Sequence, residues 1–142
     1  MSTILIVEDN PSDLKLMQRA LKKSNLKNEL ATAIDGEQAL QFLLGKDGDA
    51  YLYPLPVLVL LDIKLPKVDG LEVLEQIRRH ERTRMLPVVI LTSSREQEDV
   101  VKSYQLGVNS YIQKPVDFNQ FVEAVQQLGL YWLVLNESPF KA

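Results

Sequence analysis

The sequence predicts an α/β protein with a parallel β-sheet and helices on both of its faces. Three short runs, residues 4–7, 57–61 and 88–91, consist almost entirely of apolar residues, many of them β-branched. Such runs are typical of strands that are buried on both faces. Segments with the apolar spacing of helices separate the runs, and this alternation favours a sheet that is covered on both sides.

The elements are expected in the order strand, helix, repeated five times. Two weaker strands are expected at residues 29–33 and 109–112. Apolar residues at helical spacing mark the five helices: Leu14, Met17 and Leu21; Ala39, Leu40 and Leu43; Leu71, Leu74 and Ile77; Val100, Val101 and Tyr104; Phe118, Phe121, Val122 and Val125. The chain is too short for a barrel of eight such units, so an open sheet is predicted.

Helix starts are marked by capping residues. Asn10, Pro11 and Asp13 supply an N-cap, a proline at the first helical position and an acid in the first turn. Asp35 and Asp69 are expected to cap the second and third helices. The segment from residue 45 to 56 is longer than a typical connection, and we expect a contact surface there.

Length, charge and composition exclude several functional classes. The 142 residues fit one domain, and a net charge of −3 without a basic block argues against nucleic-acid binding. The chain has no cysteine, no apolar run long enough to span a bilayer and no signal-peptide pattern at its start. We therefore expect a cytoplasmic protein that binds neither nucleic acid nor membrane.

Polar residues follow four of the predicted strands. Glu8 and Asp9 follow the first strand, Asp62 the third, Thr92 the fourth and Lys114 the last. In an open parallel sheet, these side chains meet at the carboxyl edge, where ligands bind. Two like charges roughly 5 Å apart repel by about 3 kcal/mol at an effective dielectric near 20. A site of oxygen ligands suits Mg²⁺, which the sequence therefore predicts as the counter-charge.

The same residues have the chemistry needed for phosphoryl transfer, which requires positioning and neutralisation of charge. Asp62 is the predicted carboxylate nucleophile, and its product is an aspartyl phosphate. Lys114 supplies a mobile positive charge for a phosphate oxygen, and Thr92 offers a hydroxyl donor.

Over residues 1–128 the sequence resembles the receiver domain of bacterial two-component response regulators. The motifs that carry the resemblance are Glu8-Asp9, Asp62 followed by Pro66 and Asp69-Gly70, Thr92, Tyr111 and Lys114-Pro115. The resemblance implies a flavodoxin-like receiver fold, a five-stranded parallel sheet in the order 2-1-3-4-5.

The resemblance also implies roles for individual residues. Asp9, Asp62 and the backbone carbonyl of Lys64 would hold Mg²⁺, with Glu8 acting through water. Thr92 and Tyr111 would switch conformation upon phosphorylation. Pro115 would follow a cis peptide bond, which in general is uncommon before proline.

Simpler interpretations exist for each residue taken alone. Glu8-Asp9 and Thr92 could be helix caps, and Lys114 a solvated loop residue. Two other functional classes remain as alternatives. A metal-dependent phosphatase with an aspartate nucleophile typically has a second acid two residues on, where this chain has Lys64. A phosphorylation-independent adaptor would be expected to lack an acid or the lysine, and none is missing.

Residues 129–142 form an apolar C-terminal extension. Tyr131, Trp132 and Leu133 are the expected interface residues, because a segment that is apolar almost all round needs cover on more than one side. It could fold back on its own domain; we favour a surface for self-association, as a homodimer, or for binding a partner. With the long loop, this tail resembles stand-alone receivers that serve phytochrome-like histidine kinases.

The sequence thus predicts a stand-alone response regulator rather than an enzyme. A sensor histidine kinase, of the phytochrome-like type by that resemblance, would donate the phosphoryl group to Asp62 with Mg²⁺ bound. Output would be a conformational change read by protein contact.

Overall fold

The chain alternates strands and helices along its length. The computed structural model describes residues 3–23, 28–45, 54–94, 96–115 and 117–139. The strands are β1 (Thr3–Val7), β2 (Glu29–Ala33), β3 (Leu58–Leu61), β4 (Val88–Thr92) and β5 (Ser110–Gln113). The helices are α1 (Pro11–Lys23), α2 (Gly36–Leu44), α3 (Gly70–Arg79), α4 (Gln97–Gln105) and α5 (Phe118–Leu130), which a π-helical turn, η1 (Tyr131–Leu135), extends. The predicted alternation is confirmed, and every strand end lies within one residue of its predicted position.

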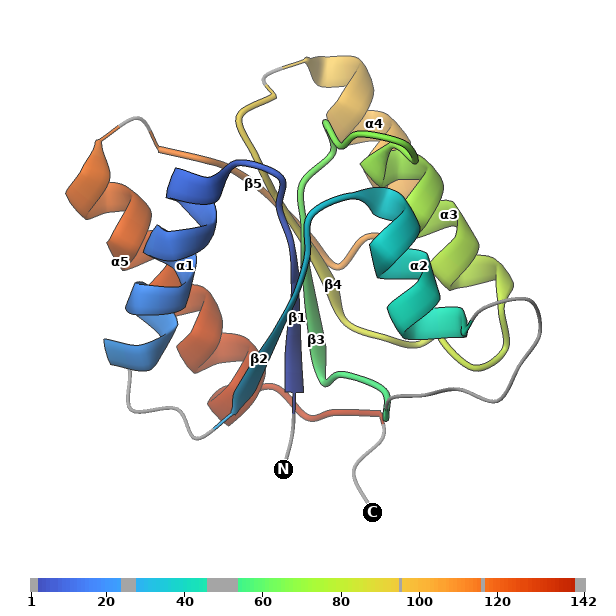
Figure 1. Ribbon diagram of the computed structural model, residues 1–142, viewed down its shortest axis with the longest axis horizontal. Helices are drawn as coiled ribbons and strands as arrows, with labels where there is room; N and C mark the ends of the chain where they lie inside the picture. Colours follow the sequence, from blue (N-terminus) through green and yellow to red (C-terminus); the bar gives the residue numbers. More distant parts are fainter. Residues whose placement is uncertain (1–2, 24–27, 46–53, 95, 116, 140–142) are drawn as a thin grey trace.

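The five strands form one parallel sheet in the order β2-β1-β3-β4-β5, as the resemblance implied. Helices α1 and α5 cover one face of the sheet, and α2, α3 and α4 cover the other (Figure 1). The inner strands β3 and β4 are buried throughout, which explains their apolar sequences. The edge strands β2 and β5 are partly exposed, and their sequence signals are correspondingly weaker.

Alternate residues of the inner strands belong to two apolar cores. In β1, Leu5 and Val7 join the core on the side of α2 and α3, whereas Ile4 and Ile6 join the core on the side of α1 and α5. Successive side chains of a strand point to opposite faces, so both faces must be apolar. Because all strand pairs are parallel, the carboxyl ends of the strands lie at one edge of this doubly covered sheet.

The loop after β3 is fixed by a close backbone approach at Gly70. The Gly70 N–H donates to the Ile63 carbonyl oxygen at 2.7 Å. A Cβ atom at position 70 would lie 2.1 Å from the Asp62 carbonyl oxygen, so only glycine fits there. The first residue of α3 thereby packs directly against the backbone of Asp62.

Two of the three predicted helix caps are confirmed. Asn10 Oδ1 accepts from the N–H groups of Ser12 and Asp13, at 2.9 and 3.1 Å. Asp35 Oδ1 accepts from the Gln38 N–H at 2.8 Å. Asp69 occupies the N-cap position of α3 but makes no capping bond with its side chain, so that prediction is wrong.

The prediction of a cis peptide bond before Pro115 is also wrong. The described residues, which include Lys114 and Pro115, contain no cis peptide bond, so this bond is trans. The trans form is the more stable one for a peptide bond before proline, by about 0.5–1 kcal/mol. The Lys114 N–H donates to the Thr92 carbonyl oxygen at 2.7 Å, which holds this residue beside β4.

The tail has a buried side and an exposed side. Trp132 and Leu133 pack against the core shared by α1 and α5. Tyr131, Val134 and Leu135 are 51%, 59% and 65% exposed. The segment therefore folds back in part and leaves an apolar surface uncovered.

Two further expectations concern loops and membranes. Residues 46–53 of the long connection, where a contact surface was expected, lie outside the described residues. None of the described helices has the length and apolar character needed to span a bilayer.

Candidate functional site

Three acidic side chains converge at the carboxyl edge of the sheet. Glu8 and Asp9 directly follow β1, and Asp62 directly follows β3, so the pairing of these two strands brings the acids together. Each residue offers a carboxylate oxygen, and these oxygens lie within 4.8 Å of one another. Glu8 and Asp62 are buried, while Asp9 is exposed. The predicted convergence is confirmed.

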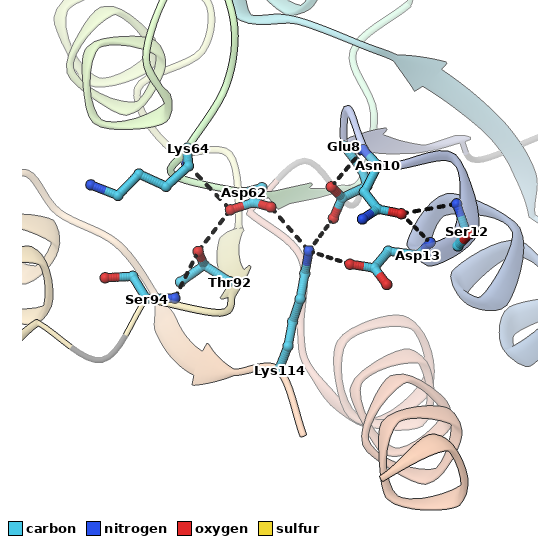
Figure 2. A network of polar contacts seen from close by, with 9 residues as sticks. All are labelled: Glu8, Asn10, Ser12, Asp13, Asp62, Lys64, Thr92, Ser94 and Lys114. Carbon is cyan, nitrogen blue, oxygen red and sulfur yellow. Dashed lines mark hydrogen bonds and ion pairs between the residues drawn. The ribbon is translucent and has the colours of Figure 1, made fainter. Parts of the chain in front are cut away.

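Lys114 extends from the end of β5 into the acid cluster (Figure 2). Its Nζ atom lies 2.5 Å from Glu8 Oε1, 2.9 Å from Asp13 Oδ2 and 3.0 Å from Asp62 Oδ2. Only 7% of this side chain is exposed. The ammonium group therefore lies between a carboxylate of α1 and the carboxylates that follow β1 and β3, and it offsets part of their mutual repulsion.

The protonation equilibria of the cluster reflect this crowding. Burial, together with the negative charge of Asp62, raises the pKa of Glu8 to about 7 despite the opposing effect of Lys114. Burial alone would lower the pKa of Lys114, but its hydrogen bonds to Glu8 and Asp13 and the charge of Asp62 raise that pKa above the ordinary lysine value. The lysine is therefore charged at neutral pH, and the acid cluster retains excess negative charge that a cation can neutralise.

Lys114 pairs with Oδ2 of Asp62, and two further donors lie near the second carboxylate oxygen, Oδ1. Thr92 Oγ1 donates to Asp62 Oδ1 at 2.7 Å, and the Lys64 N–H lies 3.3 Å from the same atom (Figure 2). Thr92 and Asp62 are both buried. The two oxygens of Asp62 thus face different partners, a hydroxyl and an N–H on one side and an ammonium on the other.

Tyr111 lies outside the acid cluster and contacts the segment after β4. Its hydroxyl donates to the Ser94 carbonyl oxygen at 3.3 Å, and its ring packs against the core shared by α2 and α3. Burial raises the pKa of Tyr111, so the hydroxyl stays protonated at neutral pH. This bond joins β5 to the connection that follows Thr92.

Two acidic residues of the wider site were not predicted from the sequence. Asp13 was considered only as a helix-start acid, yet it bonds to Lys114. Its place in the first turn of a helix that starts at the carboxyl edge was the signal that could have revealed it. Asp99 accepts a hydrogen bond from Ser94 Oγ at 2.5 Å, and nothing in the sequence distinguishes it from a surface acid.

The acid cluster fits a hard divalent cation. All three side chains offer carboxylate oxygens, which Mg²⁺ and Mn²⁺ prefer, and the described part of the chain offers no histidine or cysteine at this edge. Lys114 supplies one ammonium group to the carboxylates of Glu8, Asp13 and Asp62, so it does not balance their formal negative charge. A bound cation would supply the missing compensation.

The fold and this edge define a flavodoxin-like α/β protein whose chemistry lies at the carboxyl ends of β1, β3, β4 and β5. The chain belongs to the response regulator receiver domain family, whose sequence pattern matches residues 4–126.

Curated relatives cover most of the chain. Response regulator Rcp1 of Synechocystis sp. is 41% identical over 130 residues, which are 92% of this chain and 88% of Rcp1. The probable methanogenesis regulatory protein FilR2 of Methanothrix harundinacea is 43% identical over 136 residues, 96% of this chain and 86% of FilR2.

Solved structures of similar proteins agree with the fold. The Mn²⁺-bound form of Rcp1 gives a TM-score of 0.91 at 38% identity and covers 98% of this chain and 99% of that one. The phosphorylated cyanobacterial phytochrome response regulator RcpA gives a TM-score of 0.91 at 36% identity, and the match covers 97% of this chain and 98% of RcpA. The chain is thus similar to phytochrome response regulators, as the tail and the long loop had suggested.

Proposed function

We propose that this receiver is a phosphorylation switch whose phosphoacceptor is Asp62. The observation that carries the proposal is the surroundings of its carboxylate, which lies among two further acids and within hydrogen-bond distance of both Thr92 Oγ1 and Lys114 Nζ. A carboxylate nucleophile flanked by a hydroxyl and an ammonium has the partners that a transferred phosphoryl group requires.

The proposed transfer uses a phosphohistidine of a sensor histidine kinase as donor. An Asp62 oxygen attacks the phosphorus, an O–P bond forms and the P–N bond to the histidine breaks. Lys114 then pairs with one phosphoryl oxygen and Thr92 donates to another, so that charge on the equatorial oxygens is neutralised. A phytochrome-like kinase is the favoured donor, because RcpA is described as a phytochrome response regulator.

Mg²⁺ is the proposed cofactor. Asp9, Asp62 and the backbone carbonyl of Lys64 would hold it, with Glu8 acting through water. When bound, the ion neutralises the phosphoryl oxygens and the acid cluster. The similar protein Rcp1 has been solved in a Mn²⁺-bound form, which supports a divalent ion as the cofactor.

The proposed output is a conformational change rather than turnover of a substrate. Thr92 would move towards the phosphoryl group, and Tyr111, whose hydroxyl now bonds to Ser94, would turn inward behind it. A phosphatase with an aspartate nucleophile is disfavoured, because such enzymes typically have a second carboxylic acid two positions after the nucleophile, where this chain has Lys64.

Incubation with a small phosphodonor such as acetyl phosphate tests this function. We expect intact-mass spectrometry to show the addition of one phosphoryl group in Mg²⁺ and little addition in EDTA. Equal labelling in both conditions would contradict the proposed metal dependence. Absence of labelling in Mg²⁺ would contradict the phosphoacceptor function itself.

The exposed side of the tail is the proposed homodimer surface. Leu130, Tyr131, Val134 and Leu135 are all more than half exposed, although each is apolar or aromatic. Water contact with such a surface is unfavourable, and a second copy of the chain would remove it. Trp132 and Leu133 would act indirectly, since their packing against the core holds the exposed residues in place.

Leu135→Asp is expected to lower the apparent mass in sedimentation towards that of a monomer. The side chain is 65% exposed, so the substitution should leave the melting temperature nearly unchanged. Asn119→Asp, an equal charge change at an exposed position near the start of α5, is the matched control and should leave the mass unchanged. Equal masses for Leu135→Asp and the unsubstituted protein would contradict the proposed dimer surface.

A further inference from the structure

A second polar cluster, made of Lys64, Ser94 and Asp99, joins the loop after β3 to the start of α4. Lys64 Nζ lies 3.6 Å from Asp99 Oδ2, and Ser94 Oγ donates to the same oxygen at 2.5 Å. The Asp99 side chain is 12% exposed, whereas the Lys64 side chain is 62% exposed. A buried carboxylate is thus paired with an ammonium group that is free to move in solvent.

Helix α4 depends on this cluster because its buried side chains are polar. Asp99 and Ser103 are the buried residues of α4, and the Ser103 hydroxyl donates to the Asp99 carbonyl oxygen at 2.6 Å. Val101 and Tyr104 are instead exposed. The other four α-helices each bury apolar side chains. The packing of α4 therefore depends more on its polar contacts than the packing of the other helices does. Loss of a contact at Asp99 should destabilise α4 more than loss of one surface ion pair would destabilise another helix.

Two routes connect Asp99 to Asp62. One runs through Lys64, whose N–H lies 3.3 Å from Asp62 Oδ1. The other runs through Ser94, whose N–H lies 3.3 Å from Thr92 Oγ1, the atom that donates to Asp62. A change of charge at Asp62 is therefore next to Lys64 and is separated from Ser94 only by Thr92.

We propose that Lys64 is a second phosphate-binding cation, which Asp99 holds in the unphosphorylated protein and releases to the phosphoryl group on Asp62. The transfer of this ammonium group frees the first turn of α4. This inference rests on the proposed phosphoacceptor function of Asp62 and adds to it a charge relay that is separate from the rearrangement of Thr92 and Tyr111.

Electrostatics favour the transfer in one direction. Without a phosphoryl group, Lys114 already pairs with Asp62, and the Lys64 side chain extends away from Asp62 (Figure 2). A phosphoryl group brings roughly two negative charges and three acceptor oxygens. The lysine stem is flexible, and because the Lys64 ammonium group is exposed, solvent weakens its ion pair with Asp99. The ammonium should therefore move to the stronger anion.

Release of Lys64 leaves Asp99 buried with Ser94 as its remaining hydrogen-bond partner of this cluster. The first turn of α4 should then open more often, and the exposed face with Val101 and Tyr104 should change position. The signal thus reaches the molecular surface at α4.

Amide hydrogen exchange of residues 97–105, with and without acetyl phosphate in Mg²⁺, tests the relay. In the unsubstituted protein we expect phosphorylation to speed exchange there by up to about fivefold, the factor that loss of one exposed ion pair allows. Lys64→Met should show the faster exchange already without phosphodonor and little further change with it. Asp99→Asn keeps an acceptor for Ser94 but removes the charge, so it should behave like Lys64→Met.

The double variant should resemble each single variant, because both remove the same ion pair. Glu98→Gln, an exposed acid in the same turn of α4, is the control and should respond like the unsubstituted protein. A full phosphorylation response in Lys64→Met would overturn the relay. Intact mass is measured on the same samples: a missing mass gain would contradict the proposed phosphoacceptor function, whereas a full mass gain with unchanged exchange in α4 would overturn only the role of Lys64.

Discussion

Asp62→Asn is expected to abolish the mass gain that acetyl phosphate and Mg²⁺ produce in the unsubstituted protein. An amide is a far poorer nucleophile than a carboxylate, and it removes one of the three acids around the proposed cation site. The asparagine oxygen can still accept the Thr92 hydroxyl, so the fold should be retained. Loss of labelling would then report on the chemistry rather than on unfolding.

Asp69→Asn is the matched control for this experiment. Asp69 is exposed at the start of α3, seven positions after Asp62, and makes no side-chain capping bond. We expect this variant to be labelled like the unsubstituted protein. Undiminished labelling of Asp62→Asn, or equal loss in both variants, would contradict the assignment of Asp62 as the phosphoacceptor.

Lys114→Met is expected to lower the free energy of unfolding by roughly 3 kcal/mol in EDTA, the lower end of the range for removing one partner of a buried ion pair. Methionine keeps most of the apolar stem but leaves Glu8, Asp13 and Asp62 without their shared ammonium. Because the pKa of Lys114 is raised in the folded state, its contribution is fully present below the ordinary lysine pKa and is lost only in strongly alkaline solution.

Saturating Mg²⁺ should restore much of the stability of Lys114→Met. A ligand that binds only the folded state stabilises it by about 2.7 kcal/mol at one hundred times its Kd. Chemical denaturation in EDTA and in Mg²⁺ measures both effects. Lys15→Met, which removes an exposed lysine of α1, should change stability by no more than about 0.5 kcal/mol in either condition. A Lys114→Met variant as stable as Lys15→Met in EDTA would contradict the proposed role of the ammonium.

The sheet and its acid cluster could be predicted because each rests on a strong local signal. The inner strands are buried on both faces, so their apolar runs stand out, and the residue that follows each run must lie at the carboxyl edge. The sites of Glu8, Asp62 and Lys114 follow from this geometry alone. The edge strand β5 is partly exposed, and its sequence signal was weaker.

Contacts that depend on side-chain reach could not be predicted. Arg78 donates to the backbone carbonyls of Gly107, Arg84 and Leu86 and to the side chain of Asn109, so it joins α3 to the segments that precede β4 and β5. Nothing in the sequence separates this residue from its exposed neighbour Arg79. The partners of an arginine are fixed by tertiary packing, which local patterns do not contain.

The tail shows a similar limit. Its apolar composition predicted burial, but composition alone did not determine which side chains would face the core. Trp132 and Leu133 pack inward, and Tyr131 does not. The predicted side-chain cap at Asp69 was wrong because a tertiary contact fixes the start of α3. This contact is the close approach of Gly70 to the backbone of Asp62.

The most direct test is to locate the phosphoryl group that the protein acquires in Mg²⁺. Borohydride reduces an aspartyl phosphate to homoserine, and peptide mass spectrometry then identifies the converted residue. We expect conversion at Asp62, in proportion to the mass gain of the intact protein. Conversion at Asp9 or at any other acid, with Asp62 unchanged, would contradict the central claim.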